Sequence, residues 1–342
     1  MNRPIVVLAE PMYHPAGEEL LRRHCDVRVM HSPTAAEVAA AVGPAHAIVA
    51  RYPQRVDDAV LAAAPGVVIV ACSGRGTDAI DIEAATRRSV AVVNNPGFGP
   101  RPVSEAAFAL ILGLAKQLLP SDAWMRRGEG WKHRSNFAER MELEGKTFGI
   151  VGLGKIGVET ARKALAAFNM KVLAYDPYVS AEKVQAAGAI KVDSLDLLLV
   201  SSDVVSLHPE LNTETRGMIG EAQLRRMKPT AFLVNTSRGK VVQQAALVRA
   251  LKERWIAGAA LDVYEEEPLG PGNPLYALDN ILLMPHVAGL TMEAVEGMSL
   301  SAAQQILQAL SGVCPPHVLN REIWPAAAAR AHAANLSLEG FE

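Results

Sequence analysis

The first hundred residues alternate short β-branched hydrophobic runs with alanine-rich segments in which apolar residues recur at helical spacing. Runs such as IVVLAE (5–10), HAIVAR (46–51) and VVIVAC (67–72) are separated by segments such as TAAEVAAAV (34–42). Strands that alternate with helices need crossover connections, which produce a parallel sheet covered by helices on both faces. The pattern therefore predicts a doubly wound α/β domain.

A second alternating series begins at TFGIV (147–151), after the glycine- and proline-rich stretch NNPGFGPRP (94–102) and a polar connection. Its later runs are KVLAYD, VVSLHP, AFLVNTS, GAALDVY and ILLMPHV, and a helical pattern follows over 292–310. We predict an α/β chain of two doubly wound parallel-sheet domains. One domain spans 101–287, and the last helix returns to the first domain, which is then discontinuous over 1–100 and 288–342.

The most apolar helical segment, AAFALILGLAKQLL (106–119), is too short to span a bilayer. We expect it to be a buried helix. No signal-peptide pattern opens the chain, because MNRPIVVLAEP runs from a polar start into a short apolar run that a proline interrupts. These patterns predict a protein without a membrane partner.

Half of the residues are hydrophobic and the formal net charge is −2. No block of lysine or arginine gathers on one segment, which argues against nucleic acid as a partner and favours a small-molecule ligand. The three cysteines form no C-x-x-C pair, so neither a disulfide framework nor a zinc site is indicated. We expect a cytoplasmic protein that needs no metal.

GLGKIG (152–157) matches the dinucleotide-binding pattern G-x-G-x-x-G in its expected context, between the strand TFGIV and the helical run VETARKALAAF. Gly152 permits the tight turn, Gly154 lets the backbone approach a pyrophosphate, and Gly157 lets helix and strand pack closely. The helix N-terminus then faces the phosphates.

Asp176 ends the strand KVLAYD about twenty residues beyond the glycines, where an acidic side chain accepts hydrogen bonds from the adenosine ribose. A 2′-phosphate would meet its negative charge, so the sequence predicts NAD rather than NADP. The alternative is a solvated aspartate in the turn YDPY.

Four polar residues follow predicted strands of the second series: Arg238, Asp262, Glu267 and His286. Each alone has an ordinary structural explanation. Together they supply what reduction of a 2-oxo acid needs, because histidine donates a proton near neutral pH and a carboxylate raises its pKa. Arginine offers a bidentate clamp for the substrate carboxylate.

SGRGTD (73–78) directly follows the run VVIVAC, at the edge where parallel sheets bind ligands. Its glycines free the backbone to expose N–H groups, a state that suits an anion. The same residues also form ordinary turns, so this stretch alone leaves both interpretations open.

With these motifs in view, the chain resembles the D-isomer-specific 2-hydroxyacid dehydrogenases, a family that includes phosphoglycerate, glycerate and lactate dehydrogenases. GLGKIG with AYDPY, NTSRGKVV, AALDVYEEEP and MPHVAG occur in the family's order. The resemblance implies hydride transfer between NAD and a small D-2-hydroxy or 2-oxo acid. It also implies a flavodoxin-like substrate domain, an inserted Rossmann NAD-binding domain, and a homodimer formed through the long helix after Pro102.

The resemblance further implies roles for individual residues. His286 would be the proton donor and acceptor, Glu267 would hold and tune it, and Arg238 would orient the substrate. Substrate contacts would fall on Arg75, Gly76, Arg238 and His286. Cofactor contacts would fall on Gly152, Gly154, Lys155, Ile156, Gly157, Asp176, His208, Pro209, Thr236, Ser237, Arg238, Asp262, His286, Ala288 and Gly289.

Two departures from the family's pattern leave questions open. A small apolar residue is common where Arg75 stands, and the usual H-x-P-L-T loop reads HPELN here, which leaves the adenosine contacts of His208 and Pro209 open. If the Arg75 side chain points toward the substrate, it selects a second anionic group. If it points away, the loop is an ordinary one for the family.

The rival hypothesis is an NAD-sensing binding protein, similar to the co-repressors that resemble this family. Retention of Arg238, Glu267 and His286 together favours an enzyme. The chain also has no extended basic or low-complexity arm for partner recruitment.

Overall fold

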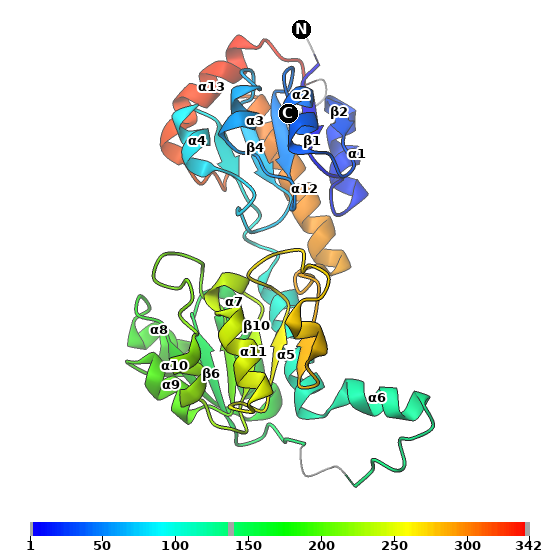
Figure 1. Ribbon diagram of the computed structural model, residues 1–342. Coiled ribbons are helices and arrows are strands. Elements are labelled where there is room, and N and C mark those ends of the chain that lie inside the picture. Colours follow the sequence, from blue (N-terminus) through cyan, green and yellow to red (C-terminus); the bar gives the residue numbers. More distant parts are fainter. Residues whose placement is uncertain (1–2, 136–139, 339–342) are drawn as a thin grey trace. The chain divides into compact units, whose positions relative to one another are not determined.

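The computed structural model describes residues 3–135 and 140–338 (Figure 1). The chain divides into two compact units. Unit 1 is Met1–Gly99 with Leu290–Glu342, and unit 2 is Pro100–Gly289. The outermost residues of the predicted ranges 1–100 and 288–342 lie outside the described part. Each unit is built on a parallel sheet, which confirms the predicted fold class.

Unit 1 contains a five-stranded sheet in the order β2-β1-β3-β4-β5, in which all neighbours pair in parallel. This strand order is that of flavodoxin-like folds. The strands are β1 (Ile5–Leu8), β2 (Asp26–Val29), β3 (Ala47–Ala50), β4 (Ile69–Cys72) and β5 (Ala91–Val93). The helices are α1 (Pro15–His24), α2 (Ala35–Ala41), α3 (Asp58–Ala62), α4 (Ile82–Arg87), α12 (Met292–Leu310), α13 (Trp324–Ala333) and the short 3₁₀ turn Arg321–Ile323.

Helices cover both faces of the unit 1 sheet, as a parallel sheet with buried strands requires (Figure 1). On one face α1, α12 and α13 contribute Leu21, Ile306 and Ala327 to a buried cluster. On the other face α2, α3 and α4 contribute residues such as Val38 and Leu61. The helix α12 matches the predicted segment 292–310 and packs against α1 and β4.

Unit 2 contains a seven-stranded parallel sheet in the order β12-β11-β10-β9-β6-β7-β8. The strands are β6 (Thr147–Val151), β7 (Lys171–Tyr175), β8 (Ile190–Lys191), β9 (Val204–Leu207), β10 (Phe232–Asn235), β11 (Gly258–Leu261) and β12 (Ile281–Leu283). The helices are α5 (Pro100–Ala115), α6 (Leu118–Arg126), α7 (Lys155–Phe168), α8 (Ala181–Ala186), α9 (Leu195–Ser201), α10 (Glu221–Arg226) and α11 (Gln244–Lys252), with 3₁₀ turns at Gly239–Val241 and Pro274–Ala277.

The order in which strands are added to the sheet reverses at β6. The strand β7 lies on one side of β6, and β9 lies on the other. In doubly wound sheets such a switch point opens a crevice at the carboxyl ends of the strands, where ligands bind. On one face of the sheet α5, α7 and α8 bury residues such as Phe108 and Ala161, and on the other α9, α10 and α11 bury residues such as Leu198 and Leu247. Two buried faces fix the sheet, so its carboxyl edge provides a rigid base for the loops.

The prediction of one buried helix over 106–119 is wrong at its carboxyl end. The helix α5 starts earlier, at Pro100, and ends at Ala115, because Gln117 adopts a left-handed backbone conformation with φ of 50°. The following helix α6 has no buried residue, and Leu118 and Leu119 are 60% and 59% exposed.

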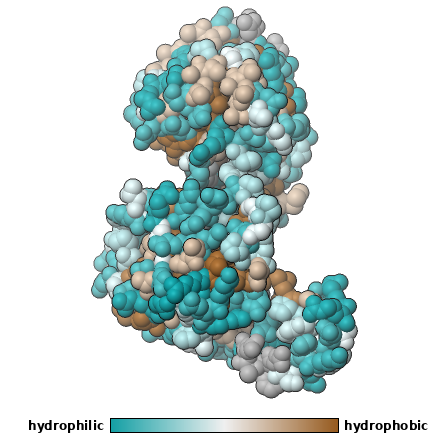
Figure 2. Space-filling view, in the orientation of Figure 1, coloured by the Kyte–Doolittle hydropathy of each residue, from teal (hydrophilic) through white to brown (hydrophobic). Residues whose placement is uncertain are grey.

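Hydrophilic residues make up most of the visible surface, with smaller hydrophobic areas among them (Figure 2).

Within the described residues, no single helix has the length and hydrophobicity to cross a membrane. The bent pair of α5 and α6 reaches that threshold only when the two helices are counted together, on length and composition alone.

Candidate active site

The glycine loop of GLGKIG connects β6 to the N-terminus of α7 in unit 2. Gly152 has φ of 86°, and a Cβ there would lie 2.7 Å from the backbone nitrogen of Pro209. A Cβ on Gly157 would lie 2.4 Å from the Gly152 carbonyl oxygen, whereas Gly154 faces open space. The loop therefore leaves room for a phosphate at Gly154, where the first N–H groups of α7 lack helical acceptors.

Asp176 follows β7 and is tied to the glycine loop. Its Oδ2 accepts a hydrogen bond from the Leu153 N–H at 2.9 Å, and its Oδ1 accepts one from the Tyr178 N–H at 3.0 Å. The carboxylate is half-buried, and it bonds both to its own turn and to the glycine loop. Each oxygen retains a further lone pair that suits a ribose hydroxyl.

Two buried polar atoms at the carboxyl ends of neighbouring strands fit a ligand. Nδ1 of His208, after β9, and Oγ1 of Thr236, after β10, find no hydrogen-bond partner among the described residues. The other ring nitrogen of His208, Nε2, lies 3.0 Å from Ser206 Oγ. Burial lowers the pKa of His208 to about 4, so the ring is neutral at physiological pH. Orphaned buried atoms are rare, and a dinucleotide in this crevice would supply their partners.

His286 and Glu267 form a close pair in unit 2. His286 Nδ1 lies 2.7 Å from Glu267 Oε2, and Glu267 Oε1 accepts the Tyr264 N–H at 2.9 Å. The hydrogen bond with Glu267 raises the pKa of His286 above its usual value, against the opposing effect of burial. Glu267 is 16% exposed and His286 49%, so the histidine ring stays accessible beyond its bond to the carboxylate. His286 also adopts a left-handed backbone conformation with φ of 57°, which is rare outside glycine.

Asp262 fixes the backbone directly after His286. Asp262 is 1% exposed, and its carboxylate accepts the N–H groups of Val287 at 2.8 Å and Ala288 at 2.9 Å. Burial raises the pKa of Asp262, while these two hydrogen bonds lower it. The family resemblance implied a cofactor contact for Asp262, and this anchoring of the histidine segment was not predicted.

Arg238 follows β10 on a segment that packs closely against Tyr264. Its Nη1 donates to the Ser237 carbonyl at 2.8 Å, and a Cβ on the next residue, Gly239, would lie 1.8 Å from the Tyr264 backbone. The positive charge of Arg238 acts to lower the pKa of His286, against the larger raising effect of Glu267. Unit 2 thus brings together Arg238, Asp262, Glu267 and His286 at the carboxyl ends of β10, β11 and β12.

Sequence reasoning missed Asn235, the last residue of β10. This fully buried amide accepts the Ser237 N–H at 3.0 Å and the Ser237 hydroxyl at 2.8 Å, and it donates to the Arg238 carbonyl at 3.0 Å. It therefore shapes the turn that carries Arg238. The position of an asparagine directly before the TSRG stretch is the signal that could have revealed it, since Asn side chains favour such local bonds.

In unit 1, two asparagine side chains donate hydrogen bonds to carbonyl groups in and beside the loop of SGRGTD. Asn95 Nδ2 donates to the carbonyls of Cys72 at 2.8 Å and Gly74 at 3.1 Å, and Asn94 Nδ2 donates to the Arg75 carbonyl at 2.9 Å. These hydrogen bonds fix the carbonyl groups of Cys72, Gly74 and Arg75 and so restrain the backbone of the loop. Arg75 is half-buried, with its Cδ 3.6 Å from the position of a Cβ on Gly99.

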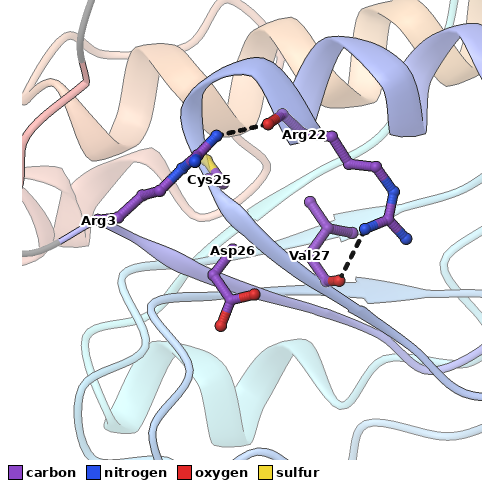
Figure 3. A pocket seen from close by; sticks show the side chains of 5 residues that line it. All are labelled: Arg3, Arg22, Cys25, Asp26 and Val27. Atoms are coloured by element: carbon purple, nitrogen blue, oxygen red, sulfur yellow. Dashed lines mark hydrogen bonds between the residues drawn. The ribbon is translucent and has the colours of Figure 1, made fainter.

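A cavity of about 500 Å³ in unit 1 lies apart from these loops (Figure 3). Its lining residues are Arg3, Arg22, Cys25, Asp26 and Val27, and Arg22 Nη1 donates to the Val27 carbonyl at 3.2 Å. These residues lie at the amino ends of β1 and β2, the edge opposite to the one where parallel sheets bind ligands. Burial raises the pKa of Cys25 to about 12, so its thiol is protonated at neutral pH. The cavity adds nothing to the candidate site.

Comparisons with known proteins identify the same kind of nucleotide-binding domain in this chain. Residues 108–288 match the family model described as D-isomer specific 2-hydroxyacid dehydrogenase, NAD binding domain. A glyoxylate reductase of Thermofilum pendens is 40% identical over 329 residues, which cover 94% of this chain and 96% of that protein. A D-3-phosphoglycerate dehydrogenase of Archaeoglobus fulgidus is 38% identical and matches 92% of this chain and 59% of its own length.

Among solved structures, the chain is similar to an NADPH-dependent glyoxylate/hydroxypyruvate reductase from Sinorhizobium meliloti in complex with NADP and malonate. The TM-score is 0.82 at 27% identity, with 93% of this chain and 98% of that chain covered.

Proposed function

Because the chain belongs to the D-isomer-specific 2-hydroxyacid dehydrogenase family, we propose that His286 is the acid–base catalyst of its oxidoreductase activity. The chain acts on 2-hydroxy or 2-oxo acids with a nicotinamide dinucleotide, as its reductase and dehydrogenase relatives indicate. Those relatives favour the enzyme over the co-repressor-like alternative. The observation that carries the proposal for His286 is its bond to Glu267.

In the reducing direction, His286 acts as an imidazolium. Its Nδ1 is bonded to Glu267, so Nε2 is the nitrogen that gives its proton to the substrate's carbonyl oxygen. Glu267 holds the ring and stabilises its positive charge, which the raised pKa of His286 supports. A bound nicotinamide dinucleotide supplies the hydride. In the oxidising direction, neutral His286 accepts the proton of the hydroxyl.

Arg238 binds the substrate carboxylate and polarises the substrate. A guanidinium suits this task because its planar fork matches a carboxylate. We also assign contacts with the substrate carboxylate to the backbone N–H groups of Arg75 and Gly76. The hydrogen bonds by which Asn94 and Asn95 fix the carbonyls of this loop support that assignment.

For the cofactor, we propose NAD rather than NADP. Asp176 accepts the adenosine ribose hydroxyls and repels a 2′-phosphate. The pyrophosphate lies at Gly154, Lys155, Ile156 and Gly157, with Gly152 forming the turn. The nicotinamide end contacts Thr236, Ser237, Arg238, Asp262, His286, Ala288 and Gly289, and His208 with Pro209 contacts the adenosine half. The orphaned atoms of His208 and Thr236 support these assignments.

We propose a small substrate, of the size of glyoxylate or hydroxypyruvate. The relatives named as glyoxylate or glyoxylate/hydroxypyruvate reductases support this size. We also propose a cytoplasmic homodimer. The exposed Leu118, Leu119 and Met125 of α6 offer apolar surface to a second copy.

The proposal is tested by following NADH oxidation with glyoxylate, hydroxypyruvate, pyruvate and bulkier 2-oxo acids. We expect turnover with at least one of the smaller acids. Absence of turnover with all of them would count against the assigned substrate class. Light scattering of the purified protein tests the homodimer, for which we expect twice the chain mass of 36.5 kDa.

A further inference from the structure

The glycine loop after β6 lies between two other loops of unit 2. Its strand β6 pairs with β7 on one side and β9 on the other. The turn after β7 is joined to the glycine loop through Asp176, which accepts the Leu153 N–H. The loop after β9 packs against the glycine loop from the other side, where Gly152 leaves no space for a Cβ beside Pro209.

A side-chain hydrogen bond connects the two flanking loops. The Tyr178 hydroxyl, from the turn after β7, donates to Glu214 Oε2, from the loop after β9. We call this contact the Tyr178–Glu214 bridge. It links the two sides of the switch point, where the adenosine half of a dinucleotide binds in doubly wound sheets.

Both partners of the bridge are held by their own loops. The Tyr178 N–H donates to Asp176 Oδ1 at 3.0 Å. Asn212 Oδ1 accepts the N–H groups of Glu214 and Thr215, both at 2.9 Å, and the Thr215 hydroxyl donates to the Glu210 carbonyl at 2.6 Å. The side chain of Glu214 is therefore presented by an ordered turn.

Tyr178 is bonded to two carboxylates, to Glu214 through its hydroxyl and to Asp176 through its backbone N–H. The pKa of Tyr178 is raised, first by its hydrogen bond to Glu214 and further by the negative charges of Glu214 and Asp176. Asp176 is the residue to which the adenosine ribose is assigned. A phosphate on the 2′-oxygen of that ribose would therefore meet two negative charges rather than one.

We propose that Glu214, positioned by Tyr178, is a second residue that excludes a 2′-phosphate and thereby makes the protein select NAD over NADP. The inference rests on the proposed placement of the ribose at Asp176. Repulsion between like charges at close range supplies the discrimination, and salt screens it because the bridge is exposed. The competing explanation is a solvated surface contact, which contributes nothing to cofactor choice.

The test measures the dissociation constants of NADH and NADPH by fluorescence titration, for wild type and for Glu214→Gln. We expect the substitution to tighten NADPH relative to NADH about fivefold at low salt, and less at higher ionic strength. Glu253→Gln is the matched control. This glutamate follows α11 at the amino edge of the sheet, and its substitution changes the net charge equally.

Tyr178→Phe keeps the carboxylate and removes the bond that holds it. We expect it to shift the ratio in the same direction but less than Glu214→Gln, and the double variant to match Glu214→Gln alone because the two residues act as a unit. A ratio that changes less than twofold in Glu214→Gln, or equally in Glu253→Gln, overturns the role of Glu214.

A different result would contradict the proposed placement of the ribose at Asp176. If Asp176→Ala leaves the NADPH to NADH ratio of wild type unchanged, the assignment of Asp176 is wrong. If Asp176→Ala tightens NADPH relative to NADH and Glu214→Gln does not, only the inference about Glu214 is wrong. A wild type that binds both cofactors equally overturns both.

Discussion

Asp262 accepts the backbone N–H of Val287 at 2.8 Å, one residue beyond His286. A residue at the end of one strand therefore fixes the backbone beside His286, the proposed acid–base catalyst, at the end of the next. Asp262→Asn replaces one acceptor oxygen by an N–H group that faces an N–H donor. We expect kcat to fall about tenfold or more and stability to fall by about 1–3 kcal/mol.

Steady-state kinetics and urea unfolding check that expectation. Asp279→Asn is the control, because Asp279 is 80% exposed and its bond to Arg254 is a surface ion pair. If Asp262→Asn behaves like Asp279→Asn in both measurements, the anchor has no functional role.

His286→Ala removes the proposed proton donor and leaves the glycine loop untouched. We expect kcat for reduction of a 2-oxo acid to fall by about 10²–10⁴-fold. NADH should still bind, because most of its proposed contacts remain. The control is His31→Ala, an exposed histidine of unit 1. Retained turnover in His286→Ala would assign the acid to another residue.

The pH dependence of reduction should depend on Glu267. Reduction needs the imidazolium, so kcat/KM falls as pH rises through the pKa of His286, which Glu267 raises. Glu267→Gln removes the charge, and we expect the descending limb to move to lower pH by about one unit. The same bond stabilises the folded state below the unfolded pKa of histidine, and this contribution disappears as pH rises through the folded pKa. An unmoved limb in Glu267→Gln would contradict the assignment.

Gly239→Ala tests the close approach that positions Arg238. The new Cβ would overlap the Tyr264 backbone, so we expect stability to fall by about 2–3 kcal/mol and KM for the oxo acid to rise. Gly270→Ala is the matched control, because nothing lies within 4 Å of its added Cβ. Thermal unfolding and steady-state kinetics distinguish the two variants, and equal effects would contradict this reasoning.

Arg75→Val tests whether this arginine selects a second anionic group. Comparison of glyoxylate with the dicarboxylate oxaloacetate separates the two orientations of the side chain. If the guanidinium binds the second group, kcat/KM falls more for oxaloacetate than for glyoxylate, by about tenfold. Equal losses for both acids would remove the selective role.

The sequence predicted the fold class, and it predicted which residues of unit 2 follow the strands, because both depend on local patterns. Alternating runs locate strands, and in a parallel sheet the residues that follow them gather at one edge, as Arg238 and His286 do. The left-handed turn at Gln117 was not predicted, because a non-glycine residue gives no signal for positive φ.

Contacts between distant segments were also missed. Tyr178 and Glu214 are 36 residues apart, and neither belongs to a recognised motif. The support of the Arg75 carbonyl by Asn94 depends likewise on the neighbouring positions of β4 and β5 in the sheet. Such pairs follow from topology, which the sequence specifies only through the fold as a whole.

The two buried atoms without hydrogen-bond partners, His208 Nδ1 and Thr236 Oγ1, affect how long the protein survives in the cell. A buried polar atom without a partner costs about 1–3 kcal/mol, and a ligand that bonds to it recovers part of that cost. A cofactor whose free concentration is about a hundred times its dissociation constant adds about 2.7 kcal/mol to folding stability. Resistance to proteolysis, and with it the amount of protein that accumulates, should therefore follow the cellular supply of the dinucleotide.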